Sequence, residues 1–241
     1  MTQRAILFDF WQTLFSDWKE RETLAARKQF MLRFLAERGH DGHVALDAAF
    51  ESSRPWFTNI YLNEQRTPLV DERLAWVLNH CNIRLGPAEL ESLAHDFAEM
   101  GLMLDPTLAP NAAPMLAELA REFKLGIVSD TGYTPGRILR RHMAKHGVLE
   151  YFSAFSFSDE TGRAKPHAVQ FQNVLQRLQV EPANAVHCGD LPTHDVRGAK
   201  ALGLTAVLYT GFHAEAADGN PPDYVISDWS ELPGVVERVF S

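Results

Sequence analysis

Two patterns of apolar residues divide the chain. Near both ends, short apolar runs alternate with helical stretches, and the first run, residues 5–8, is continuous and stops at Asp9. Such a run is typical of a strand buried on both faces of a parallel sheet. Further strands are predicted at 125–128, 155–157, 185–188, 205–209 and 224–226. Their alternation with helices predicts right-handed βαβ units in an open parallel sheet.

The stretch from residue 16 to residue 105 has helical periodicity instead. Leu74, Val77, Leu78 and Cys81 repeat at i, i+3, i+4 and i+7, which is the spacing of one helix face. No strand is predicted in this stretch, and its glycines and prolines divide it into roughly four helices. The sequence therefore predicts an α/β core of residues 1–15 and 106–241 with an inserted all-helical cap domain, residues 16–105.

Polar side chains stand where the predicted strands end. Asp9 follows the first strand, Ser129 the second, and Asp190 with Asp195 the strand at 185–188, while Lys165 precedes a proline at a predicted helix start. Ligands of open parallel sheets bind beyond the carboxyl ends of the strands. These five residues are therefore expected to converge on one site.

The chemistry of this set suits phosphoryl transfer. Three carboxylates held together repel one another, and a hard divalent cation, naturally Mg²⁺, relieves that repulsion while holding a phosphate oxygen. An aspartate can then act as a nucleophile and form an aspartyl-phosphate. Lys165 would offset anionic charge, Ser129 would donate a hydrogen bond to a phosphoryl oxygen, and backbone N–H groups near Gly132 would complete an anion cradle.

Four ordered segments of the predicted core carry these residues. They are Asp9-Phe10-Trp11-Gln12-Thr13-Leu14, Ser129-Asp130-Thr131, Lys165-Pro166, and Gly189-Asp190 followed by Asp195. In order, spacing and placement at strand ends they resemble the four motifs of the haloacid dehalogenase-like superfamily, helical-cap subclass. The resemblance implies a hydrolase with a Rossmann-like core and an all-helical cap inserted just after the first motif.

The resemblance also implies a role for each matching residue. It implies Asp9, Ser129 and Lys165 as catalytic residues, with Asp9 the nucleophile, and Thr13, Trp11 and Asp130 as substrate-binding residues. The implied ligands of Mg²⁺ are Asp9, the backbone carbonyl of Trp11 and Asp190, with Asp195 supporting the metal through water. The implied substrate is a small phosphorylated metabolite, and the implied activity is hydrolysis of a phosphoric monoester.

Trp11 departs from the pattern of the superfamily's phosphatases. These usually place a general acid/base aspartate two residues after the nucleophile, and an indole N–H cannot transfer a proton at useful pH. A good leaving group that needs no proton, a substitute such as His194 or a cap residue, or slow turnover would each reconcile Trp11 with phosphatase activity. General acid catalysis is worth ~10²–10⁴ in rate, so its loss would leave a weak enzyme.

Two other functions stay open. A metal-independent 2-haloacid dehalogenase needs a nucleophilic Asp9 but no metal and no proton for the leaving group, and haloacid dehalogenases carry an aromatic residue at the position of Trp11. In such a site the repulsion of Asp190 and Asp195 with Asp9 would go uncompensated, which favours phosphate hydrolysis. A weakly active protein that binds a phosphorylated ligand is the third hypothesis.

Composition narrows the possible partners and location. The 241 residues are 46% hydrophobic and 22% charged, which is enough apolar material for a substantial core. A net charge of −8 disfavours nucleic acid as a partner, and no apolar run reaches the length of a signal peptide or a membrane span. Only two cysteines, Cys81 and Cys188, disfavour a disulfide framework. We therefore expect a cytoplasmic protein without membrane association, either a monomer or a homodimer.

Several candidates also have structural interpretations. Ser129 can bond only its own backbone, Asp195 can cap the following helix, and His187 is expected to be a core histidine. Arg163 is an alternative to Lys165 as the phosphate partner.

The predicted cap offers no readable specificity code. It is expected to close over the site and exclude water, with hinges near Ser16 and Asp105-Pro106. Most basic side chains on helices are simply solvated, so no specificity role is assigned to its candidates, Arg27, Lys28, Arg54, Trp56 and Arg66.

Overall fold

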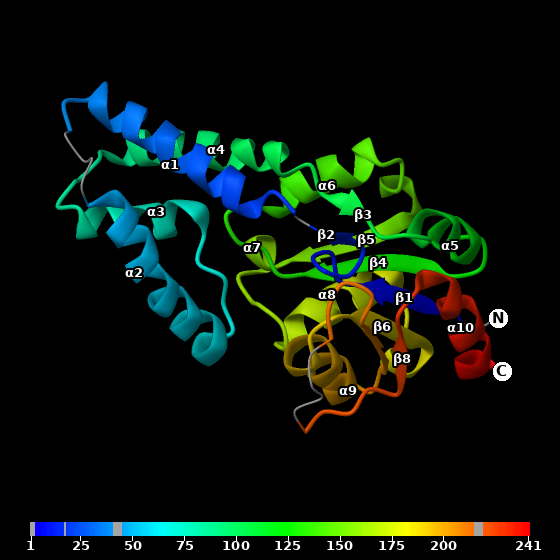
Figure 1. Cartoon of the computed structure of the whole chain (residues 1–241). Helices are drawn as coiled ribbons and strands as arrows, with labels where there is room; N and C mark the ends of the chain where they lie inside the picture. Colours follow the sequence, from blue (N-terminus) through cyan, green and yellow to red (C-terminus); the bar gives the residue numbers. More distant parts are fainter. Residues whose placement is uncertain (1–2, 17, 41–44, 215–218) are drawn as a thin grey trace.

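A six-stranded sheet with helices on both faces forms the core of the computed structural model, which describes residues 3–16, 18–40, 45–214 and 219–241 (Figure 1). In spatial order its strands are β5 (Phe152–Phe157), β4 (Lys124–Ser129), β1 (Ala5–Phe8), β6 (Ala185–Gly189), β7 (Thr205–Tyr209) and β8 (Tyr224–Ile226). All five pairings are parallel. The predicted α/β fold class is confirmed.

The central strand β1 is buried on both faces because all four of its side chains are apolar. Ile6 and Phe8 belong to a hydrophobic cluster with α5 (Ala112–Leu119), α6 (Gly136–Lys145) and α10 (Leu232–Phe240). Ala5 and Leu7 point to the opposite face and belong to the cluster with α8 (Ala168–Leu178) and α9 (Arg197–Leu202). This alternation is the strand period of two, and it fixes β1 in the middle of the three-layered core.

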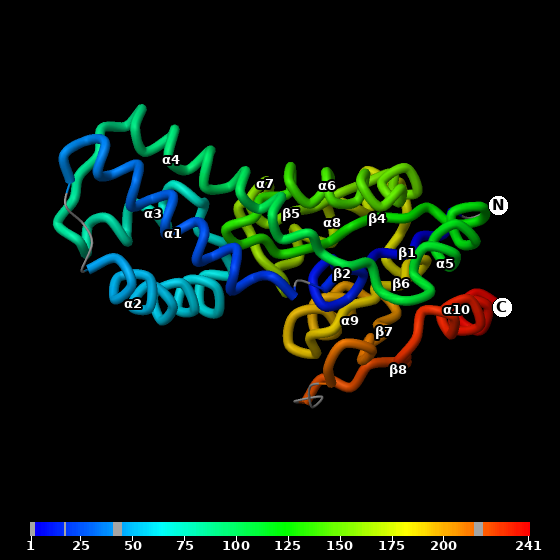
Figure 2. Tube along the Cα trace, turned by 45° about the horizontal axis from the view of Figure 1, so that its top comes forward, coloured from blue at the N-terminus to red at the C-terminus, as the bar shows by residue number. Residues whose placement is uncertain are grey.

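The helices between β2 and β3 form a separate group beside the sheet, which we call the helical region, residues 20–104 (Figures 1 and 2). Its buried side chains, among them Met31, Leu74 and Phe97, form a hydrophobic cluster of their own. Its elements are α1 (Glu20–Ala36), α2 (Leu46–Asn59), a π-helix η1 (Ile60–Glu64), α3 (Val70–His80), α4 (Pro87–Glu99) and a 3₁₀ helix η2 (Met100–Leu104).

A two-stranded antiparallel ribbon joins the sheet core to the helical region. It consists of β2 (Phe15–Ser16) and β3 (Thr107–Leu108). No strand was predicted between residues 16 and 105, so the strand residue Ser16 is a small departure from the prediction. A two-residue strand is too short to leave a periodic signal. The ribbon lies next to the predicted boundaries at 15/16 and 105/106. The division into a core and a cap domain stays a prediction.

The remaining short elements refine the predicted boundaries. Helix α8 begins at Ala168, so Lys165-Pro166 precedes the helix instead of starting it, and His167 is the N-cap whose side chain accepts from Val169 N at 3.3 Å. The other elements are η3 (Leu149–Tyr151), α7 (Ser158–Thr161), η4 (Pro182–Asn184), the π-helix η5 (Pro192–Val196) and η6 (Trp229–Glu231). Among the described helices, none combines the length and the apolar character needed to cross a bilayer.

Candidate active site

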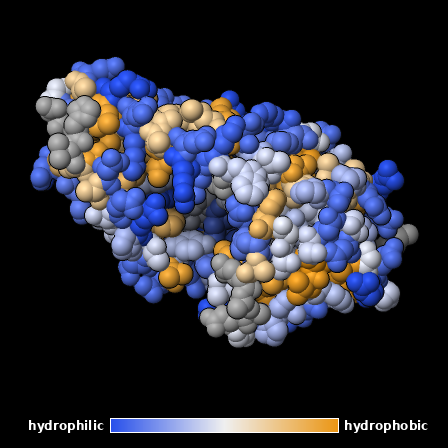
Figure 3. All heavy atoms as spheres, viewed as in Figure 1, coloured by the Kyte–Doolittle hydropathy of each residue, from blue (hydrophilic) through white to orange (hydrophobic). Residues whose placement is uncertain are grey.

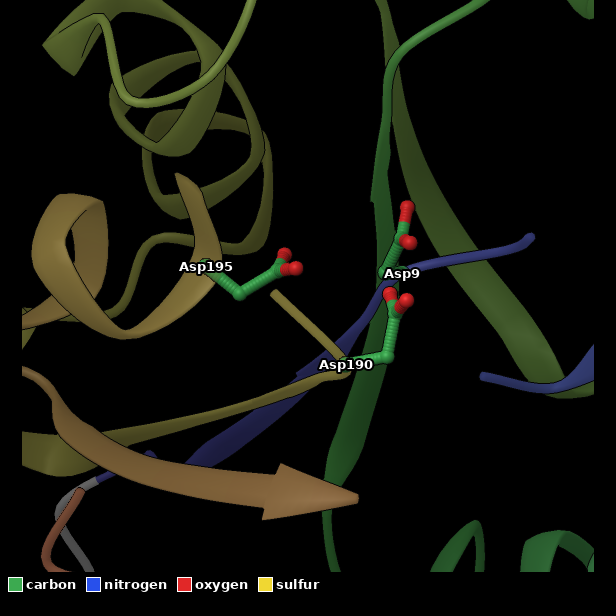
Figure 4. Close-up of side chains that lie close together, drawn as sticks. All are labelled: Asp9, Asp190 and Asp195. Atoms are coloured by element: carbon green, nitrogen blue, oxygen red, sulfur yellow. The ribbon is translucent and has the colours of Figure 1, made fainter. Parts of the chain in front are cut away.

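Two neighbouring strands and one π-helical turn bring three carboxylates together. Asp9 follows β1 and Asp190 follows β6, and the two strands pair in parallel, with Asp9 N donating to Cys188 O at 2.9 Å. Asp195 belongs to η5 and its side chain reaches toward the other two (Figure 4). One carboxylate oxygen of each residue lies within 4.8 Å of the others, and all three side chains are buried. The expected convergence of the three carboxylates at the sheet edge is therefore observed.

The ammonium group of Lys165 lies between two of these carboxylates. Its Nζ is 2.7 Å from Oδ1 of Asp9 and 2.7 Å from Oδ1 of Asp195. Asp195 also accepts hydrogen bonds from His187 Nε2 at 2.8 Å and from Leu191 N at 3.1 Å. Burial alone would raise the pKa of Asp195, but the charge of Lys165 and the His187 hydrogen bond outweigh it and hold that pKa below its usual value.

Asp190 has weaker compensation for its charge. Its Oδ1 accepts from Thr13 Oγ1 at 3.1 Å, and its Oδ2 lies 3.2 Å from Nε2 of His213. Burial, and then the neighbouring charges of Asp9 and Asp195, raise the pKa of Asp190 above its usual value. The cluster thus holds more carboxylate charge than Lys165 can offset.

The donor set fits a hard divalent cation. Oxygen is the ligand atom that Mg²⁺ prefers, and the three carboxylates offer it from one small volume. Oδ1 of Asp9 is buried and, among the described residues, has no hydrogen-bond partner, since the Lys165 contact is an ion pair without hydrogen-bond geometry. A cation at this place would relieve both the repulsion and the unsatisfied oxygen.

A pocket with a volume of about 320 Å³ opens onto the carboxylates of Asp9 and Asp190. Figure 3 shows the surface hollowed between the helical region and the sheet core, in a part rich in hydrophilic residues. The residues that line the pocket are Asp9, Trp11, Gln12, Tyr61, Asp130, Lys165, Asp190, Leu191 and His213. A separate pocket, lined in part by Asp71, His95 and Arg137, contains none of the three carboxylates.

The remaining predicted site residues take different positions. Trp11 and Asp130 line the pocket, whereas the buried hydroxyls of Thr13 and Ser129 do not. Thr13 donates to Asp190, and Ser129 Oγ donates to the carbonyl of Asp130 at 3.4 Å. Their predicted contacts with a phosphoryl group stay predictions.

The alternative candidates Arg163, His187 and His194 do not line the pocket. Arg163 is exposed and donates to Glu64 O at 3.2 Å, while Lys165 is 2% exposed and faces the carboxylates. His187 is buried behind Asp195, in the position of a core histidine. The ring of His194 stacks on Tyr61 with the centroids 5.0 Å apart and does not line the pocket.

Sequence reasoning assigned no role to four residues that line the pocket, Gln12, Tyr61, Leu191 and His213. Tyr61 comes from η1 of the helical region, and its hydroxyl donates to Oδ2 of Asp130 at 2.6 Å. No local signal marks it, because its contact depends on how the helical region sits on the core. His213 follows β7, so the rule of polar residues after strand ends would have found it had it been applied to residues 205–209.

The candidate residues of the helical region do not line the pocket. Arg27 is buried and donates to the carbonyls of Phe97 and Tyr133. The other three basic residues form ion pairs with acidic residues of the helical region, namely Lys28–Asp47, Arg54–Glu51 and Arg66–Glu72. The ring of Trp56 stacks on that of Trp76.

Comparison with known proteins identifies relatives of this fold and site. The family model described as haloacid dehalogenase-like hydrolase matches residues 3–203. A glyceraldehyde 3-phosphate phosphatase of Methanocaldococcus jannaschii is 28% identical over 134 residues, which are 54% of this chain and 57% of that protein. The match to this curated relative thus spans little more than half of its length.

Two solved structures resemble the whole chain. A haloacid dehalogenase-like phosphatase from Thermococcus onnurineus has a TM-score of 0.60 and 24% identity, with 97% of this chain and 98% of that chain covered. A 2-haloacid dehalogenase from Pseudomonas syringae pv. Tomato has a TM-score of 0.72 and 23% identity, with 99% of both chains covered. At these identities the likeness establishes the fold alone.

Proposed function

The chain belongs to the haloacid dehalogenase-like hydrolase family, and we propose that it is a Mg²⁺-dependent phosphatase of a small phosphorylated metabolite. The observation that carries the proposal is the position of Asp190, whose carboxylate lies within 4.8 Å of those of Asp9 and Asp195. In a site that holds a cation, a third buried carboxylate can serve as a ligand. In a site without a cation, it destabilises the protein through charge repulsion and desolvation.

The ligand set of this proposal is the one that the family's motifs imply. Asp9 and Asp190 would supply carboxylate oxygens, the backbone of Trp11 would supply a carbonyl oxygen, and Asp195 would support the cation through water. When bound, Mg²⁺ neutralises carboxylate charge and polarises a phosphoryl oxygen. Thr13 fixes the orientation of Asp190 through its 3.1 Å hydrogen bond.

Asp9 is the nucleophile of the proposed reaction. One of its carboxylate oxygens forms a bond to phosphorus while the bond from phosphorus to the leaving oxygen breaks, and water then hydrolyses the aspartyl-phosphate to regenerate Asp9. The ammonium group of Lys165 lies 2.7 Å from Oδ1 of Asp9 and offsets the charge of the incoming phosphate. The hydroxyl of Ser129, which lies on the adjacent strand, is a candidate donor to the phosphoryl group.

The curated relative named above supports phosphate ester hydrolysis. The relative from Methanocaldococcus jannaschii acts on glyceraldehyde 3-phosphate by its name. Because the match spans about half of that protein, we carry over only the class of substrate, a small phosphorylated molecule. The pocket volume of about 320 Å³ suits a ligand of that size.

A metal-independent 2-haloacid dehalogenase is the second candidate, and Trp11 is the observation in its favour. Trp11 lines the pocket and stands where the family's phosphatases place a carboxyl group, and dehalogenation needs no proton for the halide. In that function the carboxylate of Asp190 would stay uncompensated beside Asp9, so we rank this candidate second.

One experiment separates the candidates. The purified protein is incubated with p-nitrophenyl phosphate and with 2-chloropropionate, each in the presence of Mg²⁺ or of EDTA. Phosphate release that requires Mg²⁺, without chloride release, is the expected result. Chloride release that survives EDTA would establish the dehalogenase. Saturable binding of Mg²⁺ and phosphate, without hydrolysis of a broad substrate panel, would identify a binding protein and overturn the proposed phosphatase.

A further inference from the structure

An alkyl phosphate ester needs a proton on its leaving oxygen, and the residue expected to give it is missing. Trp11 occupies that place in the pocket, and an indole N–H does not act as an acid. A donor must therefore come from another group that lines the same pocket. The carboxyl groups there are Asp9, Asp190 and Asp130. The proposed function already uses Asp9 as nucleophile and Asp190 as a ligand of the cation.

The geometry leaves Asp130 free of both roles. It follows Ser129 at the end of β4, next to β1, and lines the pocket together with Asp9 and Trp11. Its Oδ1 accepts from the backbone N of Lys165 at 2.9 Å, and its Oδ2 accepts from the hydroxyl of Tyr61 at 2.6 Å. Two donors from different elements thus fix the carboxyl group at the pocket wall, with further lone pairs available to a ligand.

The groups that face Asp130 poise it near neutrality. Its pKa is raised to about 6, with burial as the largest cause. The charge of Lys165, the Tyr61 hydroxyl and the Lys165 backbone N–H oppose the rise, and the charge of Asp9 adds to it. Efficient proton transfer requires a pKa close to the operating pH. Tyr61 itself is unsuited to the role, because burial and then the charge of Asp130 raise the pKa of its hydroxyl far above neutrality.

The two histidines nearby are less suitable donors. His213 Nε2 lies 3.2 Å from Oδ2 of Asp190 and is therefore engaged with a proposed ligand of the cation. The ring of His194 is stacked on Tyr61, its Nδ1 lies 2.8 Å from Thr193 Oγ1, and it does not line the pocket. Both observations direct the role to Asp130.

We propose that the carboxyl group of Asp130 is the proton donor of the phosphatase reaction, with Tyr61 and the backbone of Lys165 as its positioning groups. The inference rests on the proposed function. As the bond from phosphorus to the leaving oxygen breaks and the Asp9–phosphorus bond forms, the Asp130 proton moves to the leaving oxygen, which departs as an alcohol. The Asp130 carboxylate then takes a proton from the water that attacks the aspartyl-phosphate, which restores both groups.

The test compares substrates whose leaving groups need the proton to different degrees. The wild type, Asp130→Asn and the exposed control Asp47→Asn are assayed with p-nitrophenyl, phenyl and p-methoxyphenyl phosphate in saturating Mg²⁺. Asparagine keeps the acceptor oxygen but cannot act as an acid. We expect the ratio of kcat/KM for p-nitrophenyl over phenyl phosphate to rise at least about 10-fold in Asp130→Asn. Asp47→Asn should keep the wild-type ratio.

Each outcome bears on a different claim. If the wild type hydrolyses the series but Asp130→Asn keeps its ratio, Asp130 is not the donor and the phosphatase function stands. If the wild type hydrolyses none of the series, the proposed function fails and the inference fails with it. A lower rate with an unchanged ratio would mean that Asp130 has only a structural role, and would overturn the inference.

A second variant covers the case in which Asp130→Asn does not fold. Tyr61→Phe removes a hydrogen bond that favours the carboxylate, so the pKa of Asp130 rises further. The donor is active when protonated, and its rate is lost as pH rises through that pKa. The descending limb of the phenyl phosphate pH profile should therefore move to higher pH in Tyr61→Phe. A limb that stays in place would contradict the role of Asp130.

Discussion

The ammonium nitrogen of Lys165 lies 2.7 Å from Oδ1 of Asp9, the carboxylate proposed as nucleophile. Both side chains are buried, at 3% and 7% exposure, so water contributes little to the solvation of either charge. Opposite charges at this distance in a site of low dielectric constant depend on each other. Lys165 therefore has a role in the stability of the site as well as in its chemistry.

Replacing Lys165 with methionine should destabilise the protein strongly. The change leaves Asp9 and Asp195 without their shared cation, and breaking such a buried pair typically costs about 3–5 kcal/mol. The free energy of unfolding, measured by urea titration in EDTA, should fall by that amount. The exposed neighbour Arg163 is the matched control, and Arg163→Met should change it by less than about 0.5 kcal/mol. Equal effects of the two substitutions would contradict this account.

Asp190→Asn should raise the free energy of unfolding in EDTA and lower it, relative to the wild type, in excess Mg²⁺. In EDTA it removes a carboxylate crowded by Asp9 and Asp195, so the free energy of unfolding should rise by about 1 kcal/mol. In excess Mg²⁺ the wild type should gain about 3 kcal/mol at 100 times its dissociation constant, and the variant should gain little. Thermal unfolding scans in both conditions measure the effect. If Mg²⁺ does not change the melting temperature of the wild type, a cation site at Asp190 is excluded.

Arg27→Met should loosen the contact between the helical region and the core. Arg27 donates to the carbonyls of Phe97 and Tyr133 at 2.8 and 2.9 Å, and it is only 4% exposed. Leaving buried carbonyls without donors costs about 1–3 kcal/mol, which should appear as a lower free energy of unfolding. Arg33→Met, on an exposed position of the same helix, should have almost no effect. A loss of similar size in both variants would mean that charge alone, and not these bonds, is responsible.

His142 should make stability depend on pH. Burial lowers its pKa below the usual value of about 6.5, although its hydrogen bond to the Gly101 carbonyl opposes the shift. As pH falls below about 6.5, His142 is protonated in the unfolded chain but stays neutral in the folded chain. The free energy of unfolding therefore decreases on acidification. His142→Gln should lose less stability than the wild type between pH 7.5 and about 5.5, measured by urea unfolding. The same loss in both proteins would rule out a contribution of His142.

The local pattern of apolar residues predicted a strand at each of the six positions of the sheet, with the observed bounds for some of them. The apolar run at residues 5–8 predicted β1, and residues 205–209 and 224–226 predicted β7 and β8 with their observed bounds. β1 and β7 are largely buried and leave a continuous apolar run. The edge strand β8 is partly exposed, and β5 begins at Phe152, three residues before its predicted start. The two-residue strands β2 and β3 leave no such signal.

The site could be predicted only as far as the sheet determines it. Asp9 and Asp190 follow adjacent parallel strands, so their meeting is a consequence of topology. The hydrogen bond of Tyr61 to Asp130 joins residues 69 positions apart and depends on how two groups of elements pack. Periodicity carries no information on that packing.

The most direct test of the central claim is the hydrolysis of p-nitrophenyl phosphate by the wild type and by Asp9→Asn, each with Mg²⁺ and with EDTA. The substitution preserves the shape of the side chain but removes the nucleophile, so circular dichroism should match while kcat/KM falls by more than about 10⁴-fold. Wild-type activity should require Mg²⁺. Activity in Asp9→Asn close to that of the wild type, or wild-type activity that persists in EDTA, would contradict a Mg²⁺-dependent phosphatase that works through Asp9.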